Sequence, residues 1–413
     1  MASGNPLSGW VIGVLALLNA VTPFSIDMYL SAFPAMAAEF GTSPSHVQLT
    51  LTTFLVGLAA GQLIIGTLSD RYGRRRPLII GTVACAVVSL ACATAPSIGV
   101  LMALRFAQGF CGAAGVVIAR AVIADHSRGA RAARLFAVMM VIGVLAPITA
   151  PVLGGVVVTE LGWRAVFVAL ATLNVLTLLG VVTGVRESLP HDRRRPGGFK
   201  ALGGSARSVL GNRYYLGYAL VMAFTAAALF GYVAASPFVV QDILGFSPRA
   251  YSMVFGSCAL AVAAGTLTSA RLVRVHSPRR VLMGGVTAMV VVTSLLLVNV
   301  TIGHVIGWAV IALMAGFMAC IGFIYANATA LAITEVPHAA GTGSAVLGFL
   351  QYTMGAITPP LVGLRGEHTA VPMGVVMFGA AALVALSLFV LARGHVPFSD
   401  DDDVTHTQPS MSG

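Results

Sequence analysis

Long apolar stretches constrain this chain more than any other feature. Twelve of them follow one another, each close to the roughly 20 residues that an α-helix needs to cross a bilayer. Only 9% of the 413 residues are charged, whereas a soluble domain carries roughly 25%, so a hydrated surface around all these stretches is excluded. The sequence therefore predicts an all-α integral membrane protein with twelve transmembrane helices, near residues 9–31, 46–69, 78–96, 98–123, 135–158, 162–184, 214–237, 250–272, 280–300, 302–333, 341–363 and 370–392.

The spans divide into two groups of six. The only long polar stretch between spans, residues 185–213, is rich in Arg, Gly and Pro, as a surface linker would be. A basic stretch followed by glycines, residues 66–82 after the second span, recurs as residues 271–285 after the eighth. This repeat predicts two pseudo-symmetric six-helix bundles. The predicted domains are a first bundle over 1–184, a cytoplasmic linker over 185–213, a second bundle over 214–393 and a disordered tail over 394–413.

The basic residues are distributed unevenly across the predicted membrane. Nineteen of the 24 Lys and Arg residues fall in loops or ends on one side, and three, Arg164, Arg249 and Arg365, fall on the other. Because cytoplasmic loops are enriched in Lys and Arg, both termini are predicted to be cytoplasmic. The net charge of +10 therefore indicates a membrane protein and no nucleic-acid partner. With 23 Arg against one Lys, a bacterial source is favoured, and the expected location is a bacterial inner membrane.

No cofactor and no metal site are expected. The five cysteines lie inside apolar stretches and form no CxxC or Cys/His cluster. The sequence also contains no GxxxxGK[ST] phosphate-binding loop and no evident nucleophile triad. Neither ATP-driven transport nor an enzyme is indicated.

The loop after the second span carries the most specific motif. Glycines at 66 and 73 suit a close helix approach and a tight turn, and Asp70 is placed to pair with an Arg or to cap a helix. The pattern resembles the signature loop of the major facilitator superfamily. The resemblance implies two rocking bundles around a central cavity, and a conformational latch near the start of the eleventh span formed by Gly66, Asp70, Arg71, Gly73, Arg74, Arg75 and Asp125.

Three further stretches resemble parts of the same superfamily. Arg105 and Gln108 in the fourth span match a motif associated with proton coupling. The fifth span resembles the antiporter motif at Pro147, Pro151, Gly154 and Gly155, although Ala replaces Gly before each Pro. Residues 22–30 of the first span, and residues 335–345, are similar to the bicyclomycin and chloramphenicol resistance (Bcr/CflA) branch of drug:proton antiporters. The resemblance implies a monomeric carrier whose partners are protons, a small-molecule substrate and lipid.

Asp27 is the only acidic residue well inside a predicted span. A charged residue there costs roughly 2.5–3.5 kcal/mol on insertion scales, so an acid without a use is not expected. We expect Asp27 to bind and release protons. Arg105 should lie at a similar depth, and the two charges are expected to share one cavity, with Gln108 bonded to Arg105.

The substrate cavity is expected between the bundles near the middle of the membrane. Its polar candidates are Asn19, Tyr29, Gln108, Tyr232, Tyr325, Asn327 and Gln351. For those in the second bundle, packing between helices is an equally good interpretation.

The predicted function is proton-coupled efflux of drugs or antibiotics by alternating access. Export of an endogenous metabolite, such as an amino acid or peptide, is an alternative that the sequence does not separate from it. Proton-coupled import is disfavoured by the antiporter-like fifth span. A non-transporting membrane sensor would need neither Asp27 nor Arg105.

Overall fold

The computed structural model describes residues 8–126, 129–190, 194, 207–302, 306–336, 339–363 and 369–392, without the side chains of 129–134, 136–144, 340 and 341. All regular structure in these residues is helical. Arg365, most of the predicted linker and the predicted tail lie outside the described residues.

The first half of the chain forms one helical bundle. Its elements are α1 (Gly9–Asp27), α2 (Phe33–Phe40), α3 (Pro44–Tyr72), α4 (Arg75–Ala93), α5 (Ile98–His126), α6 (Gly129–Leu161) and α7 (Trp163–Gly184). A short helical turn, Leu30–Ala32, joins α1 to α2. The predicted first span therefore continues beyond residue 31 and ends at Gly41, whose φ of 58° breaks the helix.

The second half forms a matching bundle. Its helices are α9 (Arg213–Phe238), α10 (Pro248–Leu272), α11 (Pro278–Thr301), α12 (Gly307–Thr334), α13 (Ala340–Val362) and α14 (Val371–Leu386). Short helical turns, Val239–Ile243 and Ser387–Leu391, extend α9 and α14. Pro248 and Pro278 begin their helices, where a missing N–H costs nothing.

Eleven helices in the described part of the chain are long and apolar enough to cross a membrane. The remaining predicted span, the fifth, coincides with α6, whose described apolar part is Leu145–Leu161. The all-helical membrane fold is thus confirmed. The full count of twelve crossings and the side on which the termini lie remain predictions.

The two bundles repeat the same close helix contact. In the first, a Cβ on Gly109 of α5 would lie 2.0 Å from the Phe54 carbonyl oxygen of α3. In the second, a Cβ on Gly265 of α10 would lie 2.1 Å from the Ala319 carbonyl oxygen of α12. Only glycine allows backbones this close. Because α3 and α5 hold the same places in their half as α10 and α12 hold in theirs, the contacts support the predicted pseudo-symmetry.

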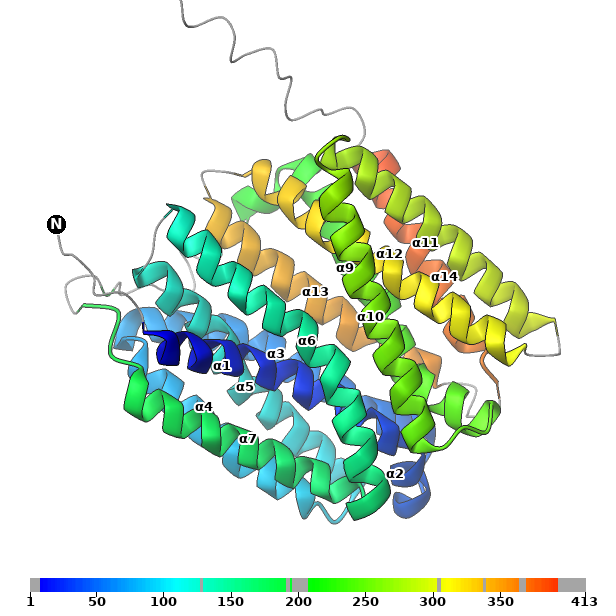
Figure 1. Cartoon of the computed structure of the whole chain (residues 1–413), viewed down its shortest axis with the longest axis horizontal. Helices are drawn as coiled ribbons and strands as arrows, with labels where there is room; N and C mark the ends of the chain where they lie inside the picture. The colour runs from blue at the N-terminus through cyan, green and yellow to red at the C-terminus, as the bar shows by residue number, and fades with distance from the viewer. Residues whose placement is uncertain are drawn as a thin grey trace, which may run out of the picture.

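The bundles lie side by side, α1–α7 in one and α9–α14 in the other (Figure 1). In the described part of the chain, three hydrogen bonds join them. Thr52 Oγ1 donates to the Ala356 carbonyl (2.8 Å), Gln48 Nε2 to the Ala234 carbonyl (3.0 Å) and Gln241 Nε2 to the Ser31 carbonyl (3.2 Å). All three lie toward the end opposite to the signature loop.

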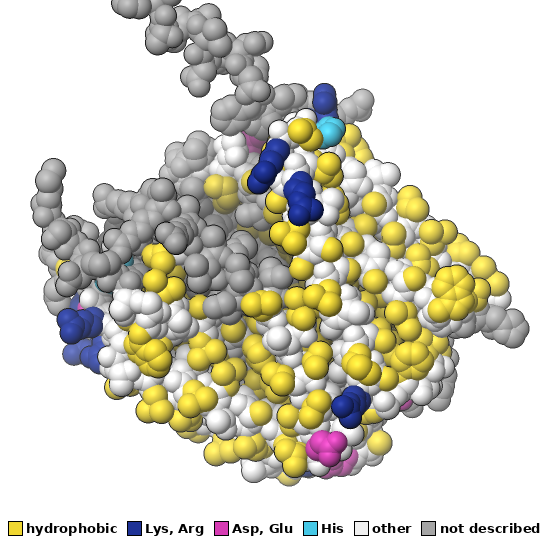
Figure 2. Space-filling model, in the orientation of Figure 1, with side chains coloured by type: hydrophobic (Ala, Val, Ile, Leu, Met, Phe, Trp, Pro, Cys, Tyr) yellow, Lys and Arg dark blue, Asp and Glu magenta, His cyan; other side chains and the backbone are white. Residues whose placement is uncertain are grey.

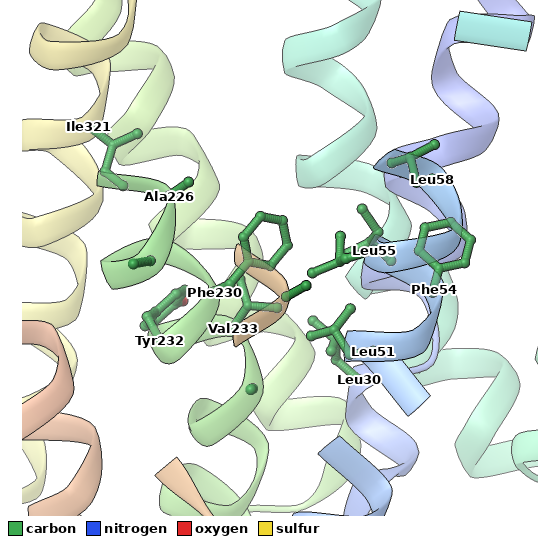
Figure 3. Close-up of a cluster of buried hydrophobic side chains, with 14 of the residues drawn as sticks. Leu30, Leu51, Phe54, Leu55, Leu58, Ala226, Phe230, Tyr232, Val233 and Ile321 are labelled. Carbon is green, nitrogen blue, oxygen red and sulfur yellow. The ribbon is translucent and has the colours of Figure 1, made fainter. Parts of the chain in front are cut away.

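Apolar side chains also close this end of the interface between the two bundles, called the seam below. Figure 3 shows Phe230 and Val233 of α9 pointing toward Leu51 and Leu55 of α3, whereas Tyr232 points away into the second bundle. All five side chains are buried. The bundles are therefore closed against each other at the end predicted to face outward.

Candidate functional site

A cavity of about 340 Å³ lies between the bundles, within the size range of small-molecule sites. Its wall comes from α1, α5 and α6 of the first bundle and from α9, α10, α12 and α13 of the second. Most of the wall is apolar or aromatic, with Phe230, Phe255 and Met318 among its members. Among the described residues, charged side chains enter it at two positions, Asp27 and Arg120.

Asp27 is the last residue of α1 and lines the cavity. Its side chain is buried. Within the described residues, its carboxyl group makes no hydrogen bond and no ion pair. Pro23 lies inside the same helix, and Met28 closes it by donating its N–H to the Phe24 carbonyl oxygen at 3.1 Å. Because the C-terminus is the negative end of the helix dipole, the backbone offers no stabilisation to an ionised carboxylate here.

Arg105 does not line this cavity, contrary to the prediction that it shares one with Asp27. Its side chain is fully buried within the first bundle. Nη1 donates to Gln108 Oε1 at 2.6 Å, and Nη2 donates to the Ser25 carbonyl at 3.0 Å. The guanidinium also lies 4.2 Å from the ring centroid of Tyr29 and 4.3 Å from that of Phe54.

The end of α1 gives the physical reason for this difference. Because α1 stops at Asp27, the Ser25 carbonyl lies among the last carbonyls of the helix, which need a partner from outside it. Arg105 supplies that partner, and the aromatic rings accept its weakly hydrated cation. Gln108 Nε2 donates to Ser89 Oγ at 2.7 Å, which fixes the amide with its oxygen toward Arg105. Arg105 thus positions the end of α1 that carries Asp27.

Arg120 is the cation that the sequence reasoning left without a role. It lies on α5 further along the chain than Arg105, is exposed at the cavity, and has no acidic partner within 4.0 Å among the described residues. An Arg inside a predicted span is itself costly, and that signal was available in the sequence. What the sequence did not show was which face of α5 the side chain occupies.

Two of the seven predicted cavity residues lie on its wall. Asn19 approaches from α1 and Gln351 from α13. The aromatic Tyr352, next to Gln351, also lines the cavity.

The other predicted cavity residues lie elsewhere. Gln108 holds Arg105, and Tyr325 is not part of the wall. The Tyr29 hydroxyl lies 3.2 Å from Thr50 Oγ1, Tyr232 stacks on Phe255 with centroids 5.5 Å apart, and Asn327 donates to Ser269 Oγ at 2.8 Å. These three side chains hold helices together, because a polar group in an apolar bundle is stabilised by a partner on the next helix.

The signature loop forms a charge cluster inside the first bundle. The buried Arg74 donates from Nη1 to Asp70 Oδ1 at 2.5 Å and to Ser69 Oγ at 2.7 Å. Its Nε donates to Asp125 Oδ2 at 3.2 Å. Asp70, Arg74 and Asp125, which the sequence analysis assigned to one latch, are therefore in contact. Arg71 lies on the surface over the ring of Tyr72.

A residue of the predicted linker completes this cluster. Glu187 accepts the backbone N–H groups of Arg74 (2.7 Å), Arg75 (3.2 Å) and Leu189 (3.0 Å), and so caps the start of α4. Burial opposes its ionisation, but these N–H groups and the nearby Arg194 hold the pKa of Glu187 below its ordinary value. Ser188 Oγ donates to Asp125 Oδ2 at 2.8 Å. No motif covers this segment, so the sequence reasoning missed it.

The two signature glycines play different parts. Gly73 has a φ of 91°, and a Cβ there would lie 2.4 Å from Glu187 Oε2, so both conformation and space require glycine. A Cβ on Gly66 would meet only Val117 Cγ1 at 3.5 Å, an ordinary contact. The predicted close helix approach at Gly66 is therefore not seen, and lies instead at Gly57 and Gly109.

The predicted contact between the cluster and the start of the eleventh span is also absent from the described residues. Gly343 of α13 accepts a hydrogen bond from the Tyr215 hydroxyl at 2.7 Å, within the second bundle. This end of the seam carries none of the hydrogen bonds that join the bundles in the described residues.

The antiporter-like glycines of α6 lie at the junction of three elements. A Cβ on Gly154 would lie 2.0 Å from the Met28 carbonyl oxygen, immediately after Asp27. A Cβ on Gly155 would lie 2.1 Å from Ser252 Oγ of the second bundle. Pro147 lines the cavity, and Pro151 lies inside the same helix. This part of α6 therefore contacts both the end of α1 and the opposite bundle.

Two helical bundles with a cavity between them are an architecture found in membrane transporters. Among solved structures, the fold is similar to a bacterial homologue of the human lysosomal transporter Spinster in its inward-facing, unoccupied conformation (TM-score 0.73, 15% identity, covering 93% of this chain and 96% of that one). It is also similar to a D-xylose–proton symporter (TM-score 0.71, 15% identity, 91% and 96% covered).

The sequence model of the Major Facilitator Superfamily matches residues 15–359, and the chain belongs to that superfamily. It is 38% identical to an uncharacterized MFS-type transporter, YdgK, of Bacillus subtilis (94% of this chain and 96% of that protein covered). It is 28% identical to a bicyclomycin resistance protein homolog of Haemophilus influenzae (91% and 94%) and 28% identical to the multidrug resistance protein MdtL of Klebsiella pneumoniae (89% and 92%). These relatives support the assignment to the Bcr/CflA branch of drug:proton antiporters.

Proposed function

We propose that this protein exports small, mostly apolar drugs or antibiotics across a bacterial inner membrane in exchange for protons. The observation that carries the proposal is an unpaired, buried carboxyl group, Asp27, in an otherwise largely apolar cavity between two bundles. The apolar wall suits drug-like compounds, and the carboxyl group gives a proton a place to bind. The relatives named for bicyclomycin and multidrug resistance support the same class of substrate.

Alternating access follows from the way in which the bundles meet. The seam is closed at the end predicted to face outward, so this arrangement corresponds to the inward-facing step of the cycle. Substrate binds from the cytoplasm when Asp27 is ionised. After the bundles rock, a proton from outside binds Asp27 and substrate leaves. Twelve crossings, cytoplasmic termini and a monomeric carrier belong to this proposal.

Export of a charged metabolite is the second candidate, and Arg120 is the observation that favours it. A purely apolar drug makes no use of a cation exposed in the cavity, whereas an amino acid or peptide presents a carboxylate to Arg120 and an ammonium group to Asp27.

A panel of antibiotics in a host that lacks its own efflux pumps tests the proposal. Expression should raise the resistance to several apolar compounds, and expression of Asp27→Asn should not. In proteoliposomes, addition of such a compound should release protons from the lumen. Resistance to no compound, together with proton release by amino acids or peptides, would favour the metabolite exporter.

A further inference from the structure

A second cavity, of about 290 Å³, lies where α10, α11 and α12 of the second bundle meet, at the end of α10. Its wall includes Leu272 and His276 near the end of α10, Arg280 and Gly284 of α11, and Phe323 of α12. It has no residue in common with the cavity between the bundles. The proposed export mechanism makes no use of it.

Missing side chains on α11 create this groove. A Cβ on Gly284 would meet nothing within 4 Å, so the space beside this residue is open. The neighbouring Gly285 has the opposite surroundings, because a Cβ there would lie 2.7 Å from Phe323 Cβ on α12. The two helices are therefore in close contact at Gly285 and leave an apolar channel beside Gly284, floored by the buried Val281 and Cys320.

One end of the channel is basic. Arg280 and His276 are both exposed at its rim. Arg280 lies in the first turn of α11, where the helix dipole also favours an anion. No Asp or Glu occurs between residues 243 and 334, and Glu335, which caps the end of α12, does not line the groove. Figure 2 shows basic side chains next to hydrophobic ones at the end of the bundle where α10 and α11 join.

We infer that this groove binds one anionic phospholipid, with the phosphate on Arg280 and His276 and an acyl chain in the channel beside Gly284. A basic rim above an apolar channel matches the two parts of such a lipid. A free phosphate would use the rim alone, and a zwitterionic lipid would bring its own cation to a site that already holds two basic groups. The inference is independent of the transported substrate.

Two variants remove the two halves of the site, and each has a matched control. Arg280→Gln removes the phosphate contact, and Arg274→Gln removes an exposed basic residue of the same connection that does not line the groove. Gly284→Leu places a side chain in the channel at a position where a Cβ meets nothing within 4 Å. Gly379→Leu adds the same side chain on α14, where a Cβ likewise meets nothing within 4 Å.

The assay is native mass spectrometry of the purified full-length chain titrated with phosphatidylglycerol, phosphatidylethanolamine or glycerol 3-phosphate. The unmodified chain and both controls should retain one phosphatidylglycerol in preference to the other two probes. Arg280→Gln and Gly284→Leu should each weaken this retention about tenfold. Arg280→Gln loses one charge-assisted contact with the phosphate, and Gly284→Leu loses a comparable free energy of acyl-chain burial.

Three results would overturn the inference. Retention unaffected by Gly284→Leu would place the acyl chain elsewhere. Equal losses in Arg280→Gln and Arg274→Gln would reduce the effect to general surface charge. Equal retention of phosphatidylglycerol and phosphatidylethanolamine would mean that only ordinary boundary lipid covers the groove.

Discussion

Arg105→Leu should separate a positioning role for this arginine from a role inside the cavity. The substitution removes the hydrogen bond from Arg105 to Gln108, which lies on the same helix, and the one to the Ser25 carbonyl at the end of α1. Leucine keeps an apolar side chain against Tyr29 and Phe54. The end of α1 then loses its external partner, although no group that lines the cavity has changed.

The magnitude follows from these contacts. Two hydrogen bonds from a charged donor contribute about 3–6 kcal/mol in soluble proteins. Hydrogen bonds between helices in a membrane average nearer ~0.6 kcal/mol, because the unfolded reference state also finds partners. For a fully buried guanidinium with two partners and two rings, we expect a loss of about 2–4 kcal/mol. Arg105→Lys keeps the charge and one of the two hydrogen bonds, so its loss should be about half.

The native cysteines supply the assay. Cys85 and Cys92 of α4 are buried, and Cys85 Sγ lies 3.8 Å from the Gln108 carbonyl oxygen. Because Cys258 and Cys320 of the second bundle are also buried, a thiol-reactive dye reports thermal unfolding of this region in detergent once these two are replaced. The unfolding midpoint should fall in the order unmodified chain, Arg105→Lys, Arg105→Leu, and proton-driven export should fall at least about tenfold in the last. Ser89→Ala, which removes the outermost hydrogen bond of the network and the bond from Ser89 to the Cys85 carbonyl of its own helix, should have the smallest effect.

A positioning role for Arg105 is excluded if Arg105→Leu unfolds at the midpoint of the unmodified chain and still exports against a gradient. Equal damage from Arg105→Lys and Arg105→Leu would also contradict it, because lysine can still donate to the Ser25 carbonyl.

Four further outcomes are expected. Asp27→Asn should abolish uphill export driven by a pH gradient in proteoliposomes while the protein stays inserted, and near-normal uphill export would remove Asp27 from the proton pathway. Arg120→Gln should raise the KM of substrates that carry a carboxylate about tenfold and leave uncharged substrates unaffected; equal changes for both would assign Arg120 a structural part. Because the folded-state pKa of Glu187 lies below its ordinary value of 4.5, its contribution to stability is present above pH 4.5 and is lost as the pH falls through the folded value. The unfolding midpoint should therefore fall less on acidification below pH 4.5 in Glu187→Gln than in the unmodified chain, and identical pH profiles would contradict this. Asp70→Asn should favour the inward-open state and raise the labelling of a Gly343→Cys variant by an impermeant thiol reagent in inside-out vesicles, on a background without native cysteines; lost transport with unchanged labelling would mean that Asp70 is not part of a latch.

Most of the fold was predictable because the bilayer fixes the length and polarity of each element. The predicted spans overlap the observed helices, and the boundaries moved only where local chemistry intervened. The first span, for example, continues through a helical turn to α2, because the chain between Asp27 and Gly41 contains no residue that must leave the helical region.

The site was predictable only in part. Asp27 stood out because a single acid inside a span is costly and recognisable from composition. The partner of Arg105 depended on where α1 ends, since only that end makes the Ser25 carbonyl available, and helix ends are poorly defined by an apolar sequence. Arg120 and Asn327 are both polar residues in spans, yet one faces the cavity and the other holds two helices together. Nothing in their local sequence distinguishes these faces.

The contacts around Asp27 also supply a route from proton binding to the movement of the bundles. Asp27 is the last residue of α1. The carbonyl oxygen of the next residue, Met28, contacts Gly154 of α6, and the adjacent Gly155 contacts Ser252 of the second bundle. Because the Met28 contact joins two backbones, a rotating side chain cannot absorb a shift there, and the shift must displace α6 against α1 or against α10. In the proposed mechanism, a change of charge at Asp27 would act on the contact between the bundles through these two successive contacts. On this view the neutral side chain of Asp27→Asn holds the bundles in one arrangement, which is why that variant should fail to export substrate uphill.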